Sequence, residues 1–546
     1  MKTILKTVSL ILCIIISLLA LCSCGEQSEP HKEGTLPGHT TAGGTAGQDG
    51  TLSSTAGSSC IHVEETIIGN AATCTEDGLT DGVKCSVCNE VLKEQEVIKA
   101  TGHVEQVLPG REATRTEDGY TEMVKCSVCG KTLVPRYQIP ATGIWSGSAA
   151  TSFAGGTGTE ADPYLISNGE QLALLARSIN NNDNNTYYDK HYKLTDDIDL
   201  GGKEWDPIGC MMSAENYKSK TRTFRGVFDG NGFTVSNFKI TSPKKAYYGY
   251  FGLFGCISGA TVKDLCITDF NIDVTAAESS VQAGGITGLC GEKSVIIDCY
   301  AAGKVNAKTS AKDGHMYAGG VAGYMSYGVQ IKNCYTDVNV SAYKGAMTNG
   351  AGGAFIGGIV GYAYWGSSNS VSVISDCASV GEVSSNPVCT VTAGGIVGSL
   401  QSYCNIKNCY SSSNVTVRSP MPVKVGGIAG DIDKNTSVTN CVYTGNASAV
   451  GTGRNSVAVG DIAGNKYRKE SVMNCYRLKG QSITAKNEVS NPFYEPEYAV
   501  VGTACELITL NSGDFYTSTL GWDESVWELS SLNVLDGKHP KMKAWN

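Results

Sequence analysis

From residue 252 onward, apolar residues fall into short runs that glycine, serine and asparagine interrupt. Runs such as Ile396-Val397, residues 406–410 and Val415-Thr416-Val417 are rich in β-branched residues and are bounded by turn-forming residues. This pattern is typical of short β-strands separated by tight turns. The sequence therefore predicts an all-β domain over most of the chain.

One segment near the start of this domain has a helical pattern instead. Four apolar residues recur at helical spacing, namely Leu172, Leu175, Ala176 and Ile179. Ser167 or Asn168 stands where a helix N-cap is expected. We expect this helix to cover the first coil of a repeat array, because terminal repeats need an atypical cap. The far cap is predicted over residues 486–546, which hold three of the six tryptophans.

A Gly-x-x-Gly motif recurs along this domain at slightly variable intervals, and each copy is followed by a cysteine. The copies begin at Gly252, Gly285, Gly320, Gly358, Gly395, Gly427 and, with aspartate in the first position, Asp461. The cysteines are Cys266, Cys299, Cys334, Cys377, Cys409, Cys441 and Cys475. The offset from motif to cysteine is 14 in six of the seven copies, and Asn or Asp precedes the last six cysteines.

A constant offset within repeats of variable length indicates a rigid segment followed by a loop. A single repeat cannot bury its own apolar residues, whereas stacked repeats can. If each repeat is one turn of a parallel β-helix, equivalent residues stack about 4.8 Å apart. The seven cysteines then form a buried structural column, with an Asn/Asp ladder beside it. The glycines would supply either a positive φ or close backbone approach.

Composition agrees with an exported β-protein. Gly accounts for 66 of 546 residues, Tyr (26) outnumbers Phe (11), and only 17% of residues are charged, against a usual ~25%. The formal net charge of −9 argues against a nucleic-acid partner, because such binding relies on clustered Lys and Arg.

The N-terminus has the pattern of an export signal with a lipidation site. Lys2 and Lys6 precede an apolar run over 8–21, which is too short for a membrane span. The segment Leu21-Cys22-Ser23-Cys24 resembles a bacterial lipobox, which implies lipidation of Cys24. Residues 1–23 are then the signal peptide, and 24–59, rich in Gly, Ser and Thr, form a flexible tether. The protein is expected on the outer face of the cell membrane.

Residues 60–143 contain two copies of a Cys/His module in the same internal spacing. In the first copy, over 60–102, the expected metal ligands are His62, Cys74, Cys85 and Cys88, with Cys60 nearby. The second copy, over 103–143, keeps only His103, Cys126 and Cys129, because Arg115 replaces the counterpart of Cys74. A Cys-x-x-Cys turn with a distant His and Cys can form a structural Zn²⁺ site. A disulfide framework is the alternative in an exported chain.

The sequence of these regions resembles two kinds of surface protein. The tandem, with its Ile139-Pro140-Ala141-Thr142-Gly143 ending, resembles short "IPATGH" repeats of Firmicutes surface proteins. Residues 152–546 resemble bacterial surface proteins with GLUG-motif repeats, through the "GTGTEADPYLI", "FDGNG", "GGIVG" and "IKNCY" segments. Such repeats accompany adhesins and the catalytic domains of IgA-cleaving peptidases. The resemblance implies a right-handed β-helix of the pectin-lyase type, with first coils over 144–250 and repeats over 251–485.

Two groups of residues bear on function. An acidic cluster at Asp196, Asp197 and Asp199, with Glu204 and Asp206 beyond, is the best candidate for carbohydrate-active catalysis. Turn roles are the ordinary use of such residues. Aromatic residues after successive Gly motifs offer a binding surface instead, namely Tyr324, Tyr327, Tyr362, Tyr364, Trp365 and Tyr403. The alternative is that these rings pack on one another or under the long loop at 341–356.

The sequence therefore favours a lipid-anchored surface β-helix without a catalytic residue. It is expected to bind an extracellular glycan or a host or cell-wall protein, with structural zinc in the Cys/His modules as its cofactor. A polysaccharide lyase or hydrolase is the alternative.

Overall fold

The computed structural model describes residues 60–114, 117–139, 143–181, 186–209, 222–241, 249–277, 279–344, 352–364, 366–465, 471–489, 497–499 and 502–545. The predicted signal peptide with Cys24, the tether, and Trp365 lie outside these residues. The chain divides into two compact units, one ending at Gly102 and the other beginning at His103, and each is described by itself.

The first unit is a small antiparallel module. One sheet has the strand order β1-β3-β4, with β1 (Glu64–Ile67), β3 (Gly82–Cys85) and β4 (Val91–Lys93); β2 (Gly78–Leu79) pairs with β5 (Val97–Ile98). Glu64 lies opposite Cys85, so the residues before β1 lie beside the turn after β3. Among the described residues of this unit, Cys74 and Cys85 are the only buried apolar side chains. Such a core is too small to stabilise a module of this size by burial alone.

The second unit begins with the same module, repeated at the period seen in the sequence. Its strands are β6 (Glu105–Leu108), β7 (Gly119–Tyr120), β8 (Met123–Cys126), β9 (Thr132–Val134) and β10 (Gln138–Ile139). Glu105 lies opposite Cys126, in the register that Glu64 and Cys85 have in the first unit. The sequence repeat is therefore also a structural repeat.

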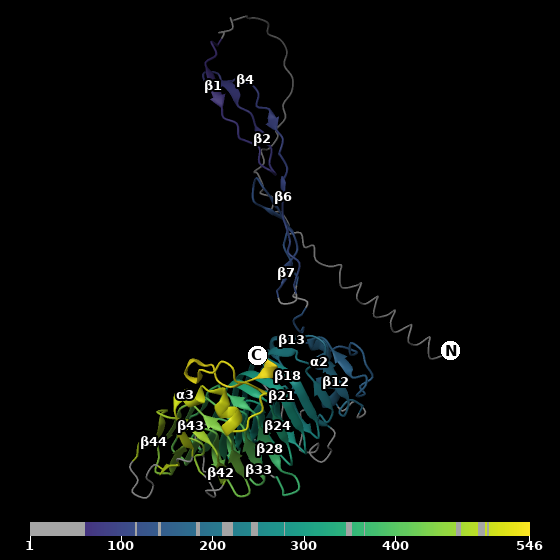
Figure 1. The fold of residues 1–546 in the computed structure, drawn as a ribbon. Helices are drawn as coiled ribbons and strands as arrows, with labels where there is room; N and C mark the ends of the chain where they lie inside the picture. Colours follow the sequence, from purple (N-terminus) through teal and green to yellow (C-terminus); the bar gives the residue numbers. More distant parts are fainter. Residues whose placement is uncertain are drawn as a thin grey trace, which may run out of the picture. The chain divides into compact units, whose positions relative to one another are not determined.

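From residue 144 to β46 (Thr503–Cys505), the described residues form a parallel β-helix, as predicted (Figure 1). Its entrance holds α2 (Gly169–Asn180), in which Asn168 caps the helix by accepting a hydrogen bond from the Gln171 N–H at 3.0 Å. The predicted apolar face of α2 is buried against the first coils, including β13. The helix thus supplies the N-terminal cap that the array requires.

Parallel strands build three sheets along the β-helix axis. The largest contains β11 (Tyr164–Ile166), β12 (His191–Leu194), β13 (Ile198–Glu204), β14 (Val227–Asp229), β15 (Thr234–Ile240), β18 (Thr261–Ala276), β21 (Val295–Thr309), β24 (Gln330–Lys332), β25 (Tyr335–Lys344), β28 (Ser372–Ser375), β29 (Ala378–Ser379), β30 (Val383–Ser385), β33 (Cys404–Lys407), β34 (Tyr410–Ser411), β35 (Val415–Ser419), β38 (Ser437–Thr439), β39 (Val442–Tyr443), β40 (Ala447–Gly451), β42 (Val472–Met473), β43 (Tyr476–Leu478), β44 (Ile483–Asn487) and β46 (Thr503–Cys505).

The second and third sheets meet at the Gly-x-x-Gly corners. The second contains β16 (Gly249–Phe251), β19 (Val281–Gly284), β22 (Met316–Gly319), β26 (Gly353–Gly357), β31 (Thr390–Gly394), β36 (Val423–Gly426), β41 (Val457–Gly460) and β45 (Glu497–Tyr498). The third contains β17 (Phe254–Ser258), β20 (Thr287–Gly291), β23 (Ala322–Ser326), β27 (Val360–Tyr364), β32 (Val397–Leu400) and β37 (Ala429–Ile432).

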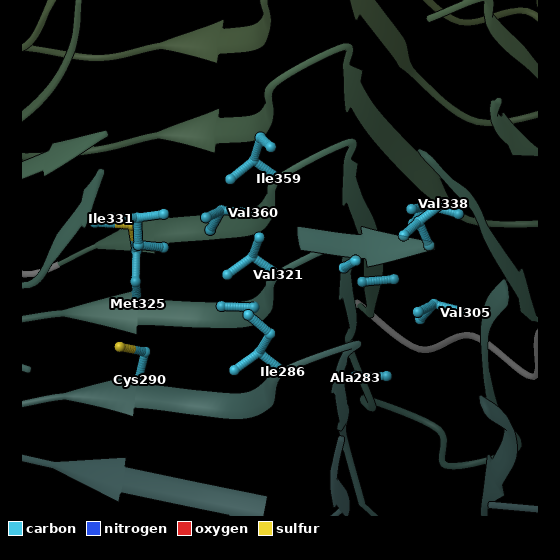
Figure 2. Close-up of a cluster of buried hydrophobic side chains, with 14 of the residues drawn as sticks. Ala283, Ile286, Cys290, Val305, Val321, Met325, Ile331, Val338, Ile359 and Val360 are labelled. Atoms are coloured by element: carbon cyan, nitrogen blue, oxygen red, sulfur yellow. The ribbon is translucent and has the colours of Figure 1, made fainter. Parts of the chain in front are cut away.

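The corner glycines allow the backbones of neighbouring coils to approach closely. A Cβ at Gly358 would lie 2.2 Å from the Gly395 carbonyl oxygen, and one at Gly361 would lie 2.5 Å from the Ala318 nitrogen. Of the two explanations open from the sequence, close approach therefore applies. The apolar residue between the glycines points into the core, where Ile286, Val321 and Ile359 of successive coils stack on one another (Figure 2).

Positive φ angles recur along the Asn/Asp column that precedes the column cysteines and Leu265. Asp264, Asp298, Asn333, Asp376, Asn408, Asn440 and Asn474 all have φ between 50° and 55°. Asn and Asp tolerate this left-handed conformation better than other residues with a side chain. Their side chains also form a ladder, in which the Asn440 Nδ2 donates to Asn408 Oδ1 at 3.2 Å and the Asn474 Nδ2 donates to Asn440 Oδ1 at 2.8 Å.

Six of the seven repeat cysteines form one buried column of free thiols. They are Cys299, Cys334, Cys377, Cys409, Cys441 and Cys475. Each thiol donates to the carbonyl oxygen two residues earlier, as Cys409 does to Lys407 at 3.2 Å. Burial raises the pKa of Cys299, Cys377 and Cys441, which keeps these thiols protonated and unreactive.

The predicted placement of Cys266 in this column is wrong. Leu265 pairs with Cys299, and Cys266 pairs with Tyr300. The two paired residues Leu265 and Cys299 are one position further apart along the chain than the motif glycines Gly252 and Gly285. This slip of a single position turns Cys266 to the other face of its strand. Cys266 is accordingly only partly buried.

The tyrosines that follow the column cysteines face outward and support the C-terminal segment. The outward column runs Cys266, Tyr300, Tyr335, Ala378, Tyr410, Val442 and Tyr476. The segment after β46 contains α3 (Leu507–Leu510), η4 (Phe515–Thr519), β47 (Trp527–Glu528), η5 (Val534–Asp536), β48 (Lys541–Met542) and η6 (Lys543–Trp545).

This segment packs against the column and returns toward β18 (Figure 1). The sequence predicts a cap over the far end here, whereas beyond β46 the segment covers the flank of several coils. Trp522 Nε1 donates to the Asn440 carbonyl oxygen at 3.0 Å, and Phe515 packs edge-on against Tyr476.

His539 fills the gap that Ala378 leaves in the tyrosine column. Its ring stacks on Tyr335 at 5.9 Å and on Tyr410 at 5.6 Å, and its Nε2 lies 2.6 Å from the Tyr335 hydroxyl. Burial, with a smaller contribution from Lys541, lowers the pKa of His539 to about 4. The imidazole is therefore neutral in the packed state at pH 7.

We predict that packing of the C-terminal segment weakens in acid. The pKa of His539 is below the ordinary value of 6.5, so the stabilisation is complete above pH 6.5 and is lost as pH falls toward 4. The shift corresponds to roughly 3 kcal/mol at its largest. Tryptophan emission should shift to the red between pH 6.5 and 4, as Trp522 and Trp527 become exposed. His539→Phe retains the stacking without the titration. An unchanged acid transition in this variant would contradict the assignment.

Candidate functional site

Four side chains of the first unit converge at the turn between β3 and β4. Cys60, His62, Cys85 and Cys88 each place one ligand atom so that all four atoms lie within 4.8 Å of one another. Cys60 Sγ lies 3.7 Å from Cys85 Sγ, and Cys88 Sγ lies 3.5 Å from His62 Nδ1. In a tetrahedral zinc site, bonds of about 2.3 Å to sulfur and 2.0–2.1 Å to nitrogen separate two sulfurs by about 3.8 Å and sulfur from nitrogen by about 3.5 Å. The donor set and its spacing therefore fit Zn²⁺.

The turn itself stabilises a thiolate. The backbone N–H groups of Cys88 and Val87 donate to Cys85 Sγ at 3.5 and 3.4 Å. These hydrogen bonds, with that from Cys88 the strongest cause, lower the pKa of Cys85 to about 5. Hydrogen bonds with Cys88 and Cys85 raise the pKa of Cys60 to about 12. A bound cation would favour the deprotonated form of all three thiols, because metal ligands bind as thiolates.

The prediction that Cys74 belongs to this shell is wrong, and Cys60 takes its position. Strand pairing explains the difference, because Glu64 opposite Cys85 places the residues before β1 next to the 85–88 turn. Cys74 follows β1 and lies toward the other end of the hairpin, where the Thr73 carbonyl oxygen accepts from the Thr101 N–H at 3.1 Å. The spacing of these residues along the chain did not indicate which end of β1 lies next to the 85–88 turn.

The second unit keeps part of the same arrangement. His103, Cys126 and Cys129 place their ligand atoms within 4.8 Å of one another, and Cys129 Sγ lies 3.5 Å from His103 Nδ1. Hydrogen bonds from the N–H groups of Cys129 and Val128 lower the pKa of Cys126 to about 5. Thr101 occupies the position in this repeat that Cys60 occupies in the first, so the repeat offers no thiol there.

A cluster of aromatic side chains covers the outside of two Gly-x-x-Gly corners. We define the aromatic cluster as Tyr317, Tyr324, Phe355, Tyr362 and Tyr364, from strands β22, β23, β26 and β27. Tyr317 and Tyr324 meet across one corner with ring centroids 5.4 Å apart, and Phe355 and Tyr362 meet across the next at 4.7 Å. Because β-strand side chains alternate, these residues face outward while their neighbours fill the core.

The cluster retains partly exposed rings and neutral hydroxyl groups. Each of its five residues is partly exposed. Burial raises the pKa of Tyr317 to about 12, and the pKa values of Tyr324 and Tyr362 also rise. The hydroxyls are therefore protonated at neutral pH and can both donate and accept hydrogen bonds. Flat apolar faces with polar edges are suited to binding a ligand of mixed polarity.

The structure brings together three of the six aromatic residues named from the sequence. Tyr324, Tyr362 and Tyr364 belong to the cluster, whereas Tyr327 and Tyr403 have left-handed backbones at separate turns. Tyr317 and Phe355 were missed because they precede the glycine motif instead of following it. Their outward position at the second residue of β22 and the third of β26 could have been inferred from strand alternation.

The acidic residues of the first coils serve as turn and ladder acceptors. Asp197 Oδ1 accepts from the Thr234 N–H at 2.9 Å, and Asp199 Oδ1 accepts from the Gly201 N–H at 2.7 Å. Glu204 Oε2 accepts from the Thr241 N–H at 3.0 Å. These bonds hold neighbouring turns together, which is the ordinary role of acidic residues at such positions.

Comparison with known proteins identifies the repeat. Residues 390–416 match the GLUG motif, in agreement with the resemblance seen in the sequence. A Gly-rich membrane protein of Evansella cellulosilytica is 33% identical over 142 residues, which cover 25% of this chain and 14% of that protein. Halomucin of Haloquadratum walsbyi is 29% identical over 168 residues, which cover 29% of this chain and 2% of halomucin. The chain thus matches only a small part of each relative.

Two solved structures also align with the chain. A candidate immunoglobulin A1 protease from Bacteroides ovatus is 20% identical and has a TM-score of 0.40, over 72% of this chain and 95% of that one. A second structure, described as an IgA1 protease, is 15% identical with a TM-score of 0.37, over 75% of this chain and 28% of that one.

Among the residues that the structure describes, no helix has the length and apolar character needed to cross a membrane.

We predict that Cys60→Ser removes one zinc ion from the purified full-length protein. Replacing a thiolate with a hydroxyl leaves an incomplete shell, and this unit has little other core to hold it together. Zinc content measured by mass spectrometry provides the readout. Ser86→Ala is the matched control, because Ser86 lies in the same turn and its Oγ donates to the Val63 carbonyl oxygen at 3.2 Å. Equal zinc content in the wild type and Cys60→Ser would contradict the four-ligand site.

Proposed function

We propose that the protein is a lipid-anchored surface protein that binds an extracellular ligand without chemically transforming it. The aromatic cluster is the observation that carries this proposal. Its rings pack against each other across successive coils, yet each remains partly exposed. The cluster is therefore a preformed surface, and binding would not require the tyrosines to be ordered first.

The chemistry of the cluster favours a glycan. Tyrosine faces pack against the C–H groups of a sugar ring, and neutral hydroxyls exchange hydrogen bonds with sugar hydroxyls. At a later corner, the same outward positions hold an ion pair instead of rings. Lys424 of β36 and Asp431 of β37 pair there at 3.0 Å. A surface protein of a host or of the cell wall is the other class of ligand that the rings can accept.

The acidic cluster argues against the enzymatic alternative. Asp197, Asp199 and Glu204 accept backbone N–H groups of the neighbouring coil or turn. A glycosidase pair instead requires one carboxyl that acts as acid and another that acts as base or nucleophile on a bound sugar. Binding without turnover is therefore the function that we propose.

Lipidation of Cys24 would place the binding domain at the cell surface. The proposal is supported by the lipobox-like segment and by matches to proteins named as a membrane protein and a halomucin. The tether at 24–59 and the two Cys/His modules, with zinc as their structural cofactor, would then act as spacers.

We predict that Tyr362→Ala reduces glycan binding at least tenfold, because Tyr362 contacts Tyr317, Tyr324, Phe355 and Tyr364. A glycan array, followed by calorimetry with the strongest array ligand, provides the measurement. Tyr343→Ala is the matched control, since Tyr343 is 52% exposed and lies outside the cluster. Both variants should have the thermal unfolding midpoint of the wild type within a few degrees. Release of reducing or unsaturated sugar ends by the wild type would support the enzyme instead.

We predict that Cys24→Ala abolishes incorporation of labelled fatty acid. The full-length protein would then either be released from the cell or keep its signal peptide. The reason is that the proposed anchor is attached to the Cys24 thiol, and its acyl chains would supply the affinity for the membrane. Cell fractionation with metabolic labelling tests it, and Cys22→Ala serves as the control. Labelling that persists in Cys24→Ala and is lost in Cys22→Ala would reassign the site.

A further inference from the structure

A cavity lies between the C-terminal segment and the first rungs of the tyrosine column. Its volume is about 570 Å³. The lining residues are Gly232, Cys266, Tyr300, Tyr335, Asp337, Lys541, Met542 and Ala544. Cavities that bind small organic ligands have volumes of roughly 300–1,000 Å³. This space is therefore large enough for one or two sugar units.

Two stacked tyrosines form one wall of the cavity. The rings of Tyr300 and Tyr335 lie 5.6 Å apart with an interplanar angle of 22°. The column continues to Cys266, which has no ring, so the stack ends at Tyr300. Tyr300 is only partly buried, whereas Tyr335 is fixed by its hydrogen bond to His539. The wall is thus a rigid aromatic surface with one accessible end.

Polar groups of opposite charge complete the lining. Asp337 follows Tyr335 on β25, and Lys541 lies on β48 of the C-terminal segment; both side chains are exposed. A carboxylate accepts hydrogen bonds and an ammonium group donates them, so the pair can bind neighbouring hydroxyls of a sugar ring. Met542, on the same strand as Lys541, contributes apolar surface.

We propose that this cavity binds a neutral hexose unit, as a free sugar or as part of a glycan. The apolar face of the ring would pack on Tyr300, and its hydroxyls would bind Asp337 and Lys541. An anionic ligand is disfavoured, because it would face the Asp337 carboxylate with a single lysine, Lys541, beside it. A quaternary ammonium ligand would lack the enclosing aromatic cage, because the two tyrosines stack parallel to each other. The site is separate from the aromatic cluster and does not depend on it.

The cavity also couples the ligand to the C-terminal segment. Lys541, Met542 and Ala544 form one side of the site, and the tyrosine column of the β-helix forms the other. A ligand that contacts both sides stabilises the packed segment by mass action. Hydrogen exchange at residues 541–544 should therefore slow when the sugar binds.

The test uses the full-length protein with glucose, galactose, N-acetylglucosamine and their β1,4-linked disaccharides as probes. Saturation-transfer NMR identifies binding, and titration calorimetry gives the dissociation constant. We expect at least one probe to bind at millimolar concentration or below, and to slow exchange at 541–544. Tyr300→Ala and Asp337→Asn should each weaken binding at least tenfold, while Tyr300→Phe should retain most of it.

The control variant is Tyr343→Ala, which removes an exposed ring that belongs neither to the cavity nor to the aromatic cluster. Sugar binding that Tyr343→Ala leaves within twofold of the wild type, and that Tyr300→Ala weakens at least tenfold, supports the second site. Binding lost in Tyr362→Ala and unchanged in Tyr300→Ala would place the sugar at the aromatic cluster and overturn the proposal. The proposal also fails if none of the sugar probes binds.

Discussion

The β-helix depends on the close approach of backbones at the Gly-x-x-Gly corner. At Gly320 a Cβ would lie 2.2 Å from the Gly358 carbonyl oxygen, and a Cβ at Gly358 would lie equally close to the Gly395 oxygen. The same corner carries hydrogen bonds from one coil to the next, such as Ile359 N–H to the Ile396 carbonyl oxygen at 2.9 Å. Side chains cannot be accommodated where these backbones meet, and the motif repeats because the successive coils that carry it have the same restriction.

The corner also determines where the outward-facing aromatic side chains lie. It turns the chain so that an outward residue before the glycines meets an outward residue after them, as Tyr317 meets Tyr324. Parallel pairing then aligns these positions in successive coils, so Tyr324 lies beside Tyr362. A surface of stacked rings therefore follows from strand alternation and rung spacing, without any long loop. On the tyrosine column, the same register stacks Tyr300 on Tyr335 and forms the wall of the cavity.

The sequence was sufficient to predict what depends on local periodicity. The coil and the Asn/Asp ladder follow from residues that recur at fixed offsets, and the capping helix follows from its helical spacing, with Ser167 or Asn168 as the expected N-cap. Predictions failed where pairing between distant segments decides the outcome. Cys266 left the cysteine column because two coils pair with a slip of a single position, and Cys60 replaced Cys74 because β1 runs antiparallel to β3. The packing of the C-terminal segment on the flank was not predictable, since the gap at Ala378 and the distant His539 that fills it carry no shared pattern.

Repeat arrays commonly gain or lose units during evolution, because each unit contacts only its neighbours. The C-terminal segment changes this situation here. It contacts rungs from Tyr476 back to Tyr300, and His539 occupies the vacancy at Ala378 among them. Duplicating a coil between these points would shift the vacancy by one rung, about 4.8 Å, relative to a segment of unchanged length. The constant length of the segment therefore restricts the number of coils that it spans, whereas the number of coils closer to the N-terminus is not restricted in this way.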